Sequence, residues 1–321
     1  MNRSFSLLGF VAVFACALEA RAQEKIQLPT DPQAWINSAP LSTDMLAGKA
    51  AFLWYFEEGC PRCRERWPAM IEAAKKFEGK PIVFIAINSG NERAVVQQYV
   101  REVALPWPVI VDTDRSLEKK SGVSEISLQN IYQSKLLMPD GRLAGGSFNL
   151  EESATAALAT AKWRVDPAEV PSSLKAAWLQ IEFGNFAAAA PTVKKSVNAV
   201  MPDVKAAAEK LLAAVKAEMD KEAEAAKQSL AGGNKWDAYK AYSFLSLRFK
   251  GYDLPSDAQP TLKELAADEK VKNQLAALKL WDSAQRQSAV AAANTMRRIV
   301  NQYPDTEAAA LAQGALAKTA N

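Results

Sequence analysis

The sequence predicts an α/β sandwich with a mixed central sheet, followed by an all-α, helical-repeat-like domain. Two observations support this division. Strand-like and helix-like segments alternate over residues 23–164, which is typical of α/β proteins. No convincing strand follows residue 165, where alanine and lysine dominate. The length of 321 residues accommodates two domains, and a hydrophobic content of 49% supplies a sizeable core.

The elements of the first domain follow from local composition. Apolar runs rich in β-branched and aromatic residues predict buried strands at 50–56, 82–88 and 109–112. Helical periodicity, with a capping Asp114 before the third helix, predicts helices at 64–76, 91–103, 115–121 and 151–163. Met138-Pro139-Asp140-Gly141 predicts a hairpin turn between strands near 132–137 and 142–146.

The second domain is expected to consist of helical hairpins. Residues 204–231 predict a long helix that ends at Gly232-Gly233. The segments 183–189 and 233–239 each contain Gly-Asn, then an aromatic residue and then alanine, and they resemble the turn of tetratricopeptide repeats. The two glycines lie farther apart than the roughly 34 residues of that repeat. Residues 303–307 predict a further helix–turn–helix junction.

Residues 1–22 predict a signal peptide. A basic Arg3, an apolar run over 5–18 and the small-x-small sequence Ala20-Arg21-Ala22 fit such a leader. The apolar run is shorter than the roughly 20 residues of a spanning helix, so we expect no membrane span after the signal is removed. Export to the periplasm follows, and anchoring as a lipoprotein at Cys16 is the alternative. The expected domains are 1–22, 23–164 and 165–321.

The amino-acid composition limits the reactions and ligands to be expected of this protein. The sequence has no histidine, which removes imidazole-based triads and the commonest metal ligand. A net charge of +3 gives no reason to expect nucleic acid as a partner. Signal cleavage would remove Cys16 and leave Cys60 and Cys63 as the remaining cysteines. A structural zinc site needs four ligands, so we expect no metal and no cofactor, and reversible redox chemistry remains.

Cys60-Pro61-Arg62-Cys63 is the motif that carries this chemistry. It lies between a predicted strand and a predicted helix, so Cys60 is expected at an exposed helix N-terminus. Free backbone N–H groups and the helix dipole favour a thiolate at that position. Arg62 adds a favourable cation, whereas Glu57 and Glu58 oppose the thiolate through like-charge repulsion.

Residues 31–163 resemble the TlpA-like branch of the thioredoxin superfamily. The resemblance rests on the Cys-x-x-Cys, on Pro68 after it, and on three flanking segments: Leu46-Ala47-Gly48-Lys49, Leu105-Pro106-Trp107-Pro108 and Pro139-Asp140-Gly141-Arg142. It implies a thioredoxin-like fold and thiol–disulfide oxidoreductase activity. Cys60 would attack a disulfide and Cys63 would resolve the product, with a protein client that carries thiols or a disulfide and a separate redox partner.

Three departures from that family concern the same site. Gly59 stands where the family has tryptophan, and Arg66 stands where it has an acidic residue. The family also places a cis-proline beside the redox pair, and Tyr132 occupies that slot here. Because a non-proline cis peptide costs roughly 3 kcal/mol, we expect a trans bond and altered client docking. Pro61, Arg62, Pro68 and Tyr132 are the expected supporting residues.

Three functions from different classes remain open. The first is an exported thiol–disulfide oxidoreductase whose helical domain selects or positions a client. The second is a non-catalytic interaction protein, in which the helical repeats bind a protein partner. The third is a dimer in which two chains supply four cysteines to a metal or cluster.

Overall fold

A computed structural model describes residues 26–127, 130–131 and 133–319. The chain divides into two compact units, one of residues 1–78 and 82–161 and the other of residues 79–81 and 162–321. The expected signal peptide, with Cys16, lies outside the described residues. Within them, no helix combines the length and apolar character needed to cross a bilayer.

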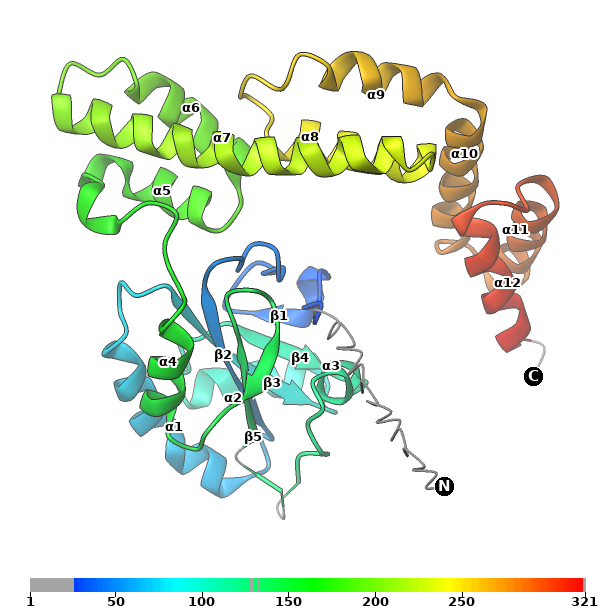
Figure 1. Ribbon diagram of the computed structural model, residues 1–321. Helices are drawn as coiled ribbons and strands as arrows, with labels where there is room; N and C mark the ends of the chain where they lie inside the picture. Colours follow the sequence, from blue (N-terminus) through cyan, green and yellow to red (C-terminus); the bar gives the residue numbers. More distant parts are fainter. Residues whose placement is uncertain (1–25, 128–129, 132, 320–321) are drawn as a thin grey trace, which may run out of the picture. The chain divides into compact units, whose positions relative to one another are not determined.

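The first unit is built on one six-stranded mixed sheet (Figure 1). Its strand order is β1-β4-β3-β2-β5-β6. Strand β2 pairs parallel with β3 and antiparallel with β5. The strands are β1 (Trp35–Ile36), β2 (Ala50–Phe56), β3 (Ile82–Ser89), β4 (Val109–Asp112), β5 (Gln133–Leu137) and β6 (Leu143–Gly145).

Strand β2 is the centre of this unit because its whole sequence is apolar or aromatic. All seven of its residues are buried. Phe52, Trp54 and Phe56 belong to the core cluster on one face of the sheet. On the other face, the Tyr55 hydroxyl donates to Ser121 Oγ at 2.6 Å. A strand covered on both faces is a continuous hydrophobic run rather than an alternating one.

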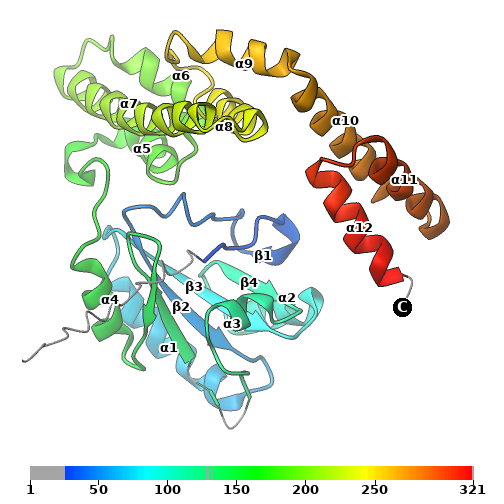
Figure 2. The same ribbon diagram turned by 45° about the vertical axis from the view of Figure 1, so that its right-hand side comes forward.

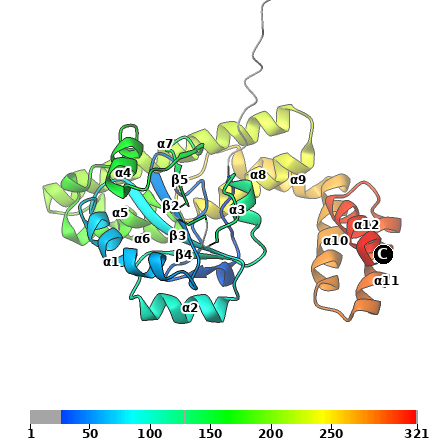
Figure 3. The ribbon, with the colours of Figure 1, turned by 90° about the horizontal axis from the view of Figure 1, so that it is seen from below.

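Helices cover both faces of the sheet. Helices α1, α2 and α4 contribute to the same buried cluster as Phe52, Trp54 and Phe56. Helix α3 lies on the opposite face, and the view along the strands separates α1 from α3 (Figure 3). The helices are α1 (Pro61–Lys75), α2 (Arg93–Glu102), α3 (Ser116–Lys120) and α4 (Leu150–Leu158), with a 3-10 turn at Pro32–Ala34.

Two features of this unit differ from the sequence-based expectations. Strand β1 was not predicted, because two residues carry too little periodicity; it pairs with β4 through Trp35 opposite Ile110. Helix α4 ends at Leu158, short of the expected residue 163. Trp163 lies beyond the helix and donates its indole N–H to the carbonyl of Gly79 at 2.9 Å.

The second unit is helical, as expected, and no strand occurs in its described residues up to 319. After two 3-10 turns at Pro167–Glu169 and Ser172–Leu174, its helices are α5 (Lys175–Glu182), α6 (Phe186–Ser196), α7 (Pro202–Ala231), α8 (Lys235–Arg248), α9 (Ala258–Ala267), α10 (Glu269–Ala284), α11 (Ala289–Gln302) and α12 (Glu307–Thr319). The last three form a cluster of their own (Figure 2).

Glycines in the left-handed conformation make the two close helix–helix turns. Gly184, with φ of 73°, separates α5 from α6, and Gly233, with φ of 80°, separates α7 from α8. A residue with a side chain is strained at such angles, whereas glycine is not. The core of this unit includes the rings of Phe186 and Phe249, which stack with centroids 4.8 Å apart.

This packing predicts how two substitutions change the stability of the helical unit. Phe186 is 0% exposed and Leu247 is 70% exposed. Phe186→Ala is expected to lower the free energy of unfolding by about 3–5 kcal/mol, because it opens a cavity in the core. Leu247→Ala is expected to change it by less than about 0.5 kcal/mol. Urea unfolding followed by far-UV circular dichroism tests both; equal effects would contradict the packing described above.

Candidate functional site

The two cysteines lie at the junction between β2 and α1. Strand β2 ends at Phe56, three loop residues follow, and Cys60 is the N-cap of α1. The backbone N–H of Cys60 donates to the carbonyl of Glu57 at 3.2 Å. The backbone N–H of Cys63 donates to Cys60 Sγ, also at 3.2 Å. The sulfur of Cys60 thus occupies the position of a capping oxygen, where the helix dipole favours negative charge.

Both thiols are free and both residues are buried, at 1% exposure each. The expectation that Cys60 is exposed is therefore wrong. Its burial results from packing, because Cys60 and Cys63 belong to the same core cluster as Phe56 and Trp67. The Cys60 side chain is therefore almost entirely shielded from solvent in this conformation.

The Cys63 thiol is hard to ionise. Burial raises its pKa to about 12, and the hydrogen bond with Cys60 and the charges of Cys60 and Glu57 act in the same direction. A backbone hydrogen bond from Glu57 lowers the pKa and offsets part of this rise. Cys63 is accordingly a neutral thiol near neutral pH.

The two cysteines belong to the same buried cluster as several aromatic residues. The indole N–H of Trp67 donates to the hydroxyl of Tyr99 at 3.0 Å. Phe56 stacks on Tyr99 and meets Trp67 edge-on, with centroids 5.5 and 5.3 Å apart. Burial raises the pKa of Tyr99 to about 12, and the Arg64 guanidinium 4.7 Å from the ring centroid acts against that rise. The hydroxyl of Tyr99 therefore stays protonated beside the thiols.

The expected supporting residues occupy different places. Pro61 is the first residue of α1, where its missing N–H costs no hydrogen bond. Arg62 is exposed in the first turn. Pro68 is exposed inside α1, which is assigned as one helix from Pro61 to Lys75. Tyr132 lies outside the described residues, so its role and its peptide bond remain predictions.

A polar cluster beside the loop was missed in the sequence. The amide of Asn88 donates from Nδ2 to Glu58 Oε2 at 3.1 Å and to the carbonyl of Phe56 at 3.4 Å. Asn91 Nδ2 donates to the same Glu58 oxygen at 2.5 Å. The available signal was Asn88 itself, a polar residue directly after the apolar run of this strand.

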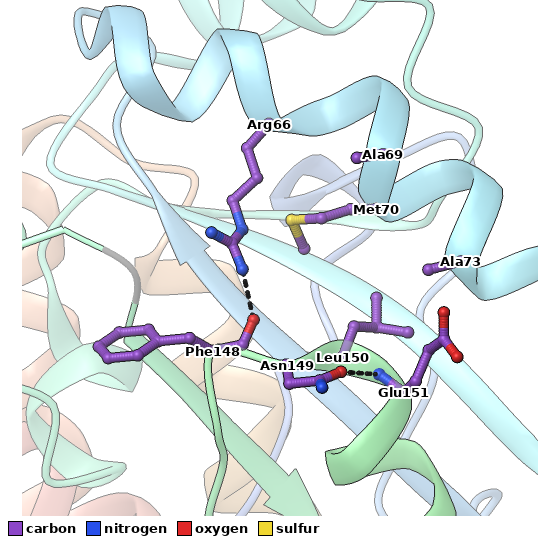
Figure 4. Close-up of a pocket in the computed structure, with 8 residues that line it drawn as sticks. All are labelled: Arg66, Ala69, Met70, Ala73, Phe148, Asn149, Leu150 and Glu151. Atoms are coloured by element: carbon purple, nitrogen blue, oxygen red, sulfur yellow. Dashed lines mark hydrogen bonds between the residues drawn. The ribbon is translucent and has the colours of Figure 1, made fainter.

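Arg66 lies one turn beyond Cys63 and points to α4 rather than to the thiols. It donates to the carbonyl of Phe148, and its guanidinium lies 5.5 Å from the ring centroid of Trp54. A surface pocket of about 500 Å³ opens beside it, between α1 and the start of α4 (Figure 4). Its lining residues are Arg66, Ala69, Met70, Ala73, Phe148, Asn149, Leu150 and Glu151. Neither cysteine lines it, so the pocket is a neighbour of the site.

The arrangement can form and break a disulfide between two adjacent thiols. Among the described residues, no group of three or more histidine, cysteine, aspartate or glutamate side chains is placed to hold a metal ion.

Comparison with known proteins shows which family the first unit resembles. Residues 25–140 match the AhpC/TSA family. The fold and the paired cysteines thus define a thioredoxin-like domain of that family, followed by a helical C-terminal region. The domain is similar to thiol–disulfide oxidoreductases of the ResA type, which confirms the resemblance and the fold class expected from the sequence.

Two of these relatives illustrate how far the similarity extends. Thiol-disulfide oxidoreductase ResA of Bacillus subtilis (strain 168) is 24% identical over 153 residues, covering 44% of this chain and 83% of that protein. ResA of Halalkalibacterium halodurans is 28% identical over 67 residues, covering 21% of this chain and 38% of that protein. The chain thus spans most of the first relative and less than half of the second.

Solved structures align with a similar share of the chain. A thiol:disulfide interchange protein of Chlorobium tepidum matches with a TM-score of 0.35 and 22% identity, over 42% of this chain and 97% of that one. A secreted Mycobacterium tuberculosis disulfide oxidoreductase, described as homologous to E. coli DsbE, matches with a TM-score of 0.33 and 20% identity, over 43% and 99%.

The raised pKa of Cys63 predicts its alkylation profile. In a Cys60→Ser variant, burial still raises the pKa of Cys63, so the rate of iodoacetamide modification should keep rising about tenfold per pH unit beyond pH 10. In 6 M guanidinium chloride, the same thiol should level off as it titrates near about 8.5. Mass spectrometry of the alkylated peptide measures both rates. A plateau below pH 10 in the folded chain would refute the assignment.

Proposed function

We propose that this chain is an exported thiol–disulfide oxidoreductase that exchanges disulfides with protein clients through Cys60 and Cys63. The observation that carries the proposal is the bond from the Cys63 backbone N–H to Cys60 Sγ at the start of α1. It places one sulfur where a thiolate is favoured and the second thiol within the same helical turn.

In the first step, the Cys60 thiolate attacks one sulfur of a client disulfide. A bond forms between Cys60 Sγ and that sulfur, the client S–S bond breaks, and the other client sulfur leaves as a thiolate that takes up a proton. The client at this stage is joined to the chain through a mixed disulfide. Arg62, exposed in the first turn of α1, supports the negative charge on Cys60 as the reaction begins.

In the second step, Cys63 loses its proton and attacks Cys60 Sγ. The Cys60–Cys63 disulfide forms, the mixed disulfide breaks, and the second client sulfur leaves as a thiol. Two electrons have then passed from the pair to the client. The charge of Cys60 is one cause of the raised pKa of Cys63, and a Cys60 bonded to the client carries no charge. Cys63 therefore becomes easier to ionise when it is needed.

The remaining parts of the proposal concern the surroundings of the pair. Pro61 starts α1 and Pro68 lies within it, so both act on the geometry of the helix that carries the thiols. Tyr132 is proposed to line the site in place of the family's cis-proline. A separate redox partner returns the pair to its starting state, and the reaction runs in reverse when the pair starts as a disulfide.

Export to the periplasm and a role for the helical unit complete the proposal. The leader-like residues 1–22 support export, with a lipid anchor at Cys16 as the alternative. One similar solved protein is described as secreted. The helical hairpins α5–α6 and α7–α8 are proposed to select or position the client, in the manner of tetratricopeptide-like repeats.

Reduction of insulin by dithiothreitol tests the activity. The wild-type chain should accelerate it, and Cys60→Ser should reduce the acceleration at least about 100-fold, because the attacking sulfur is lost. Far-UV circular dichroism of the variant controls for folding. A wild-type chain no faster than Cys60→Ser would reject the enzyme and favour a non-catalytic interaction protein.

A Cys63→Ser variant tests the order of the two sulfurs. Without a resolving thiol, it should accumulate client proteins in covalent complexes that dithiothreitol releases. Non-reducing electrophoresis and mass spectrometry would identify them. Cys60→Ser/Cys63→Ser is the matched control; equal trapping by it would show that the complexes do not form through Cys60.

A further inference from the structure

The Asn88–Glu58–Asn91 cluster connects the loop that precedes Cys60 to the end of β3. Both amides donate from Nδ2 to the same carboxylate oxygen, Glu58 Oε2, at 3.1 and 2.5 Å. Asn91 Nδ2 also donates to Asn88 Oδ1 at 3.3 Å, so the two amides are joined to each other. Asn88 is 0% exposed, and Glu58 and Asn91 are half-buried.

The cluster is attached to the end of the strand that delivers Cys60. Asn88 on β3 stands opposite Phe56 in the parallel register and donates to its carbonyl at 3.4 Å. The loop from Phe56 to Cys60 contains Glu58 at its middle. The Glu58 carboxylate is thereby held at the same edge of the sheet from which α1 begins.

A carboxylate in this position affects the two redox states of the pair differently. The reduced pair has a sulfur that can carry negative charge, and the disulfide has none. A fixed negative charge nearby disfavours the thiolate and hence the reduced state, and partial burial strengthens that effect. A mobile carboxylate in water would be screened.

We propose that Asn88 and Asn91 are positioning residues that fix the Glu58 carboxylate on the loop that leads into Cys60, and that this fixed charge makes the Cys60–Cys63 pair more reducing. The inference rests on the proposed function, since it sets the direction in which that site moves electrons. The pair gives up two electrons and two protons to become a disulfide, and oxidised glutathione takes them up as two thiols.

Other charged or titratable groups near the two cysteines are kept constant in the test. The charge of Glu57 is one cause of the raised pKa of Cys63, and the Arg64 guanidinium lies 4.7 Å from the centroid of the Tyr99 ring. Arg62 lies between the two cysteines in the chain. Tyr99 and Cys63 are the titratable neighbours.

Three variants separate the charge from the shape of the cluster. Glu58→Gln removes the charge but keeps an oxygen that both amides can reach. Asn91→Ala keeps the charge but removes one of its two donors, whereas Asn88 is left intact because it also holds the Phe56 carbonyl. Glu65→Gln is the matched control, since Glu65 is exposed on α1 and two residues beyond Cys63.

The measurement is the equilibrium constant with glutathione. The full chain, carrying Cys16→Ser so that two thiols remain, is equilibrated at pH 7 and pH 9, quenched by alkylation and weighed by mass spectrometry. Glu58→Gln should shift the equilibrium toward the dithiol about threefold to tenfold at pH 9, where tenfold corresponds to about 30 mV. The charge acts on the thiolate and not on the neutral thiol, so the shift should be at least as large at pH 9 as at pH 7.

The remaining variants decide whether the amides act by fixing that charge. Asn91→Ala should shift the equilibrium in the same direction by less than Glu58→Gln, and Glu65→Gln by less than twofold. A Glu58→Gln shift below twofold at pH 9, an equal shift in Glu65→Gln, or an Asn91→Ala chain identical to the wild type would each overturn the inference. A cluster that only supports the fold would move the unfolding transition and leave the equilibrium constant unchanged.

Failure of the proposed function can be distinguished from failure of this inference, because the two are measured in different assays. Glutathione requires no client docking, so the equilibrium constant is measurable even in a chain that does not reduce insulin. An inactive wild type with the expected Glu58→Gln shift would reject the function and keep the inference. A wild-type chain that reduces insulin, together with no shift in Glu58→Gln, would keep the proposed function and reject the inference.

Discussion

The burial of β2 is the constraint on which the site depends. This strand is buried along its whole length, and it is hydrogen-bonded to β3 on one edge and to β5 on the other. A strand held on all sides cannot slide by one residue without moving Phe52, Trp54 and Phe56 to the opposite face of the sheet. The point at which the chain leaves the sheet is therefore fixed, and with it the position of Cys60 and the start of α1.

The sequence predicted what depends on neighbouring residues. The apolar run of β2, the hairpin turn before β6 and the glycine turns of the helical unit are local patterns, and each is found where the pattern placed it. The Cys-x-x-Cys was placed correctly at the strand–helix junction for the same reason. Local composition is sufficient there because the chain's own chemistry decides the conformation.

What the sequence missed depends on residues far apart in the chain. The burial of Cys60 arises from packing in a cluster with Trp67, whose indole in turn bonds Tyr99 on another helix. Glu58 accepts hydrogen bonds from Asn88 and Asn91, which lie some thirty positions later in the sequence. Only the parallel register of β2 and β3 brings these residues close to Glu58. No periodicity in a single segment reports such contacts.

The Cys60 sulfur also caps the N-terminus of α1, and this role changes when the sulfur forms a disulfide. In the reduced chain it accepts the backbone N–H of Cys63. A sulfur that is bonded to a client carries no negative charge, so it is a poorer acceptor, and the first turn of α1 is held less firmly during that interval. Under the proposed function, Cys63 is the resolving residue; it lies on this same turn, and its thiol has to approach the Cys60 sulfur. In the proposed cycle, the bond to the client thus loosens the part of the backbone whose movement releases the client.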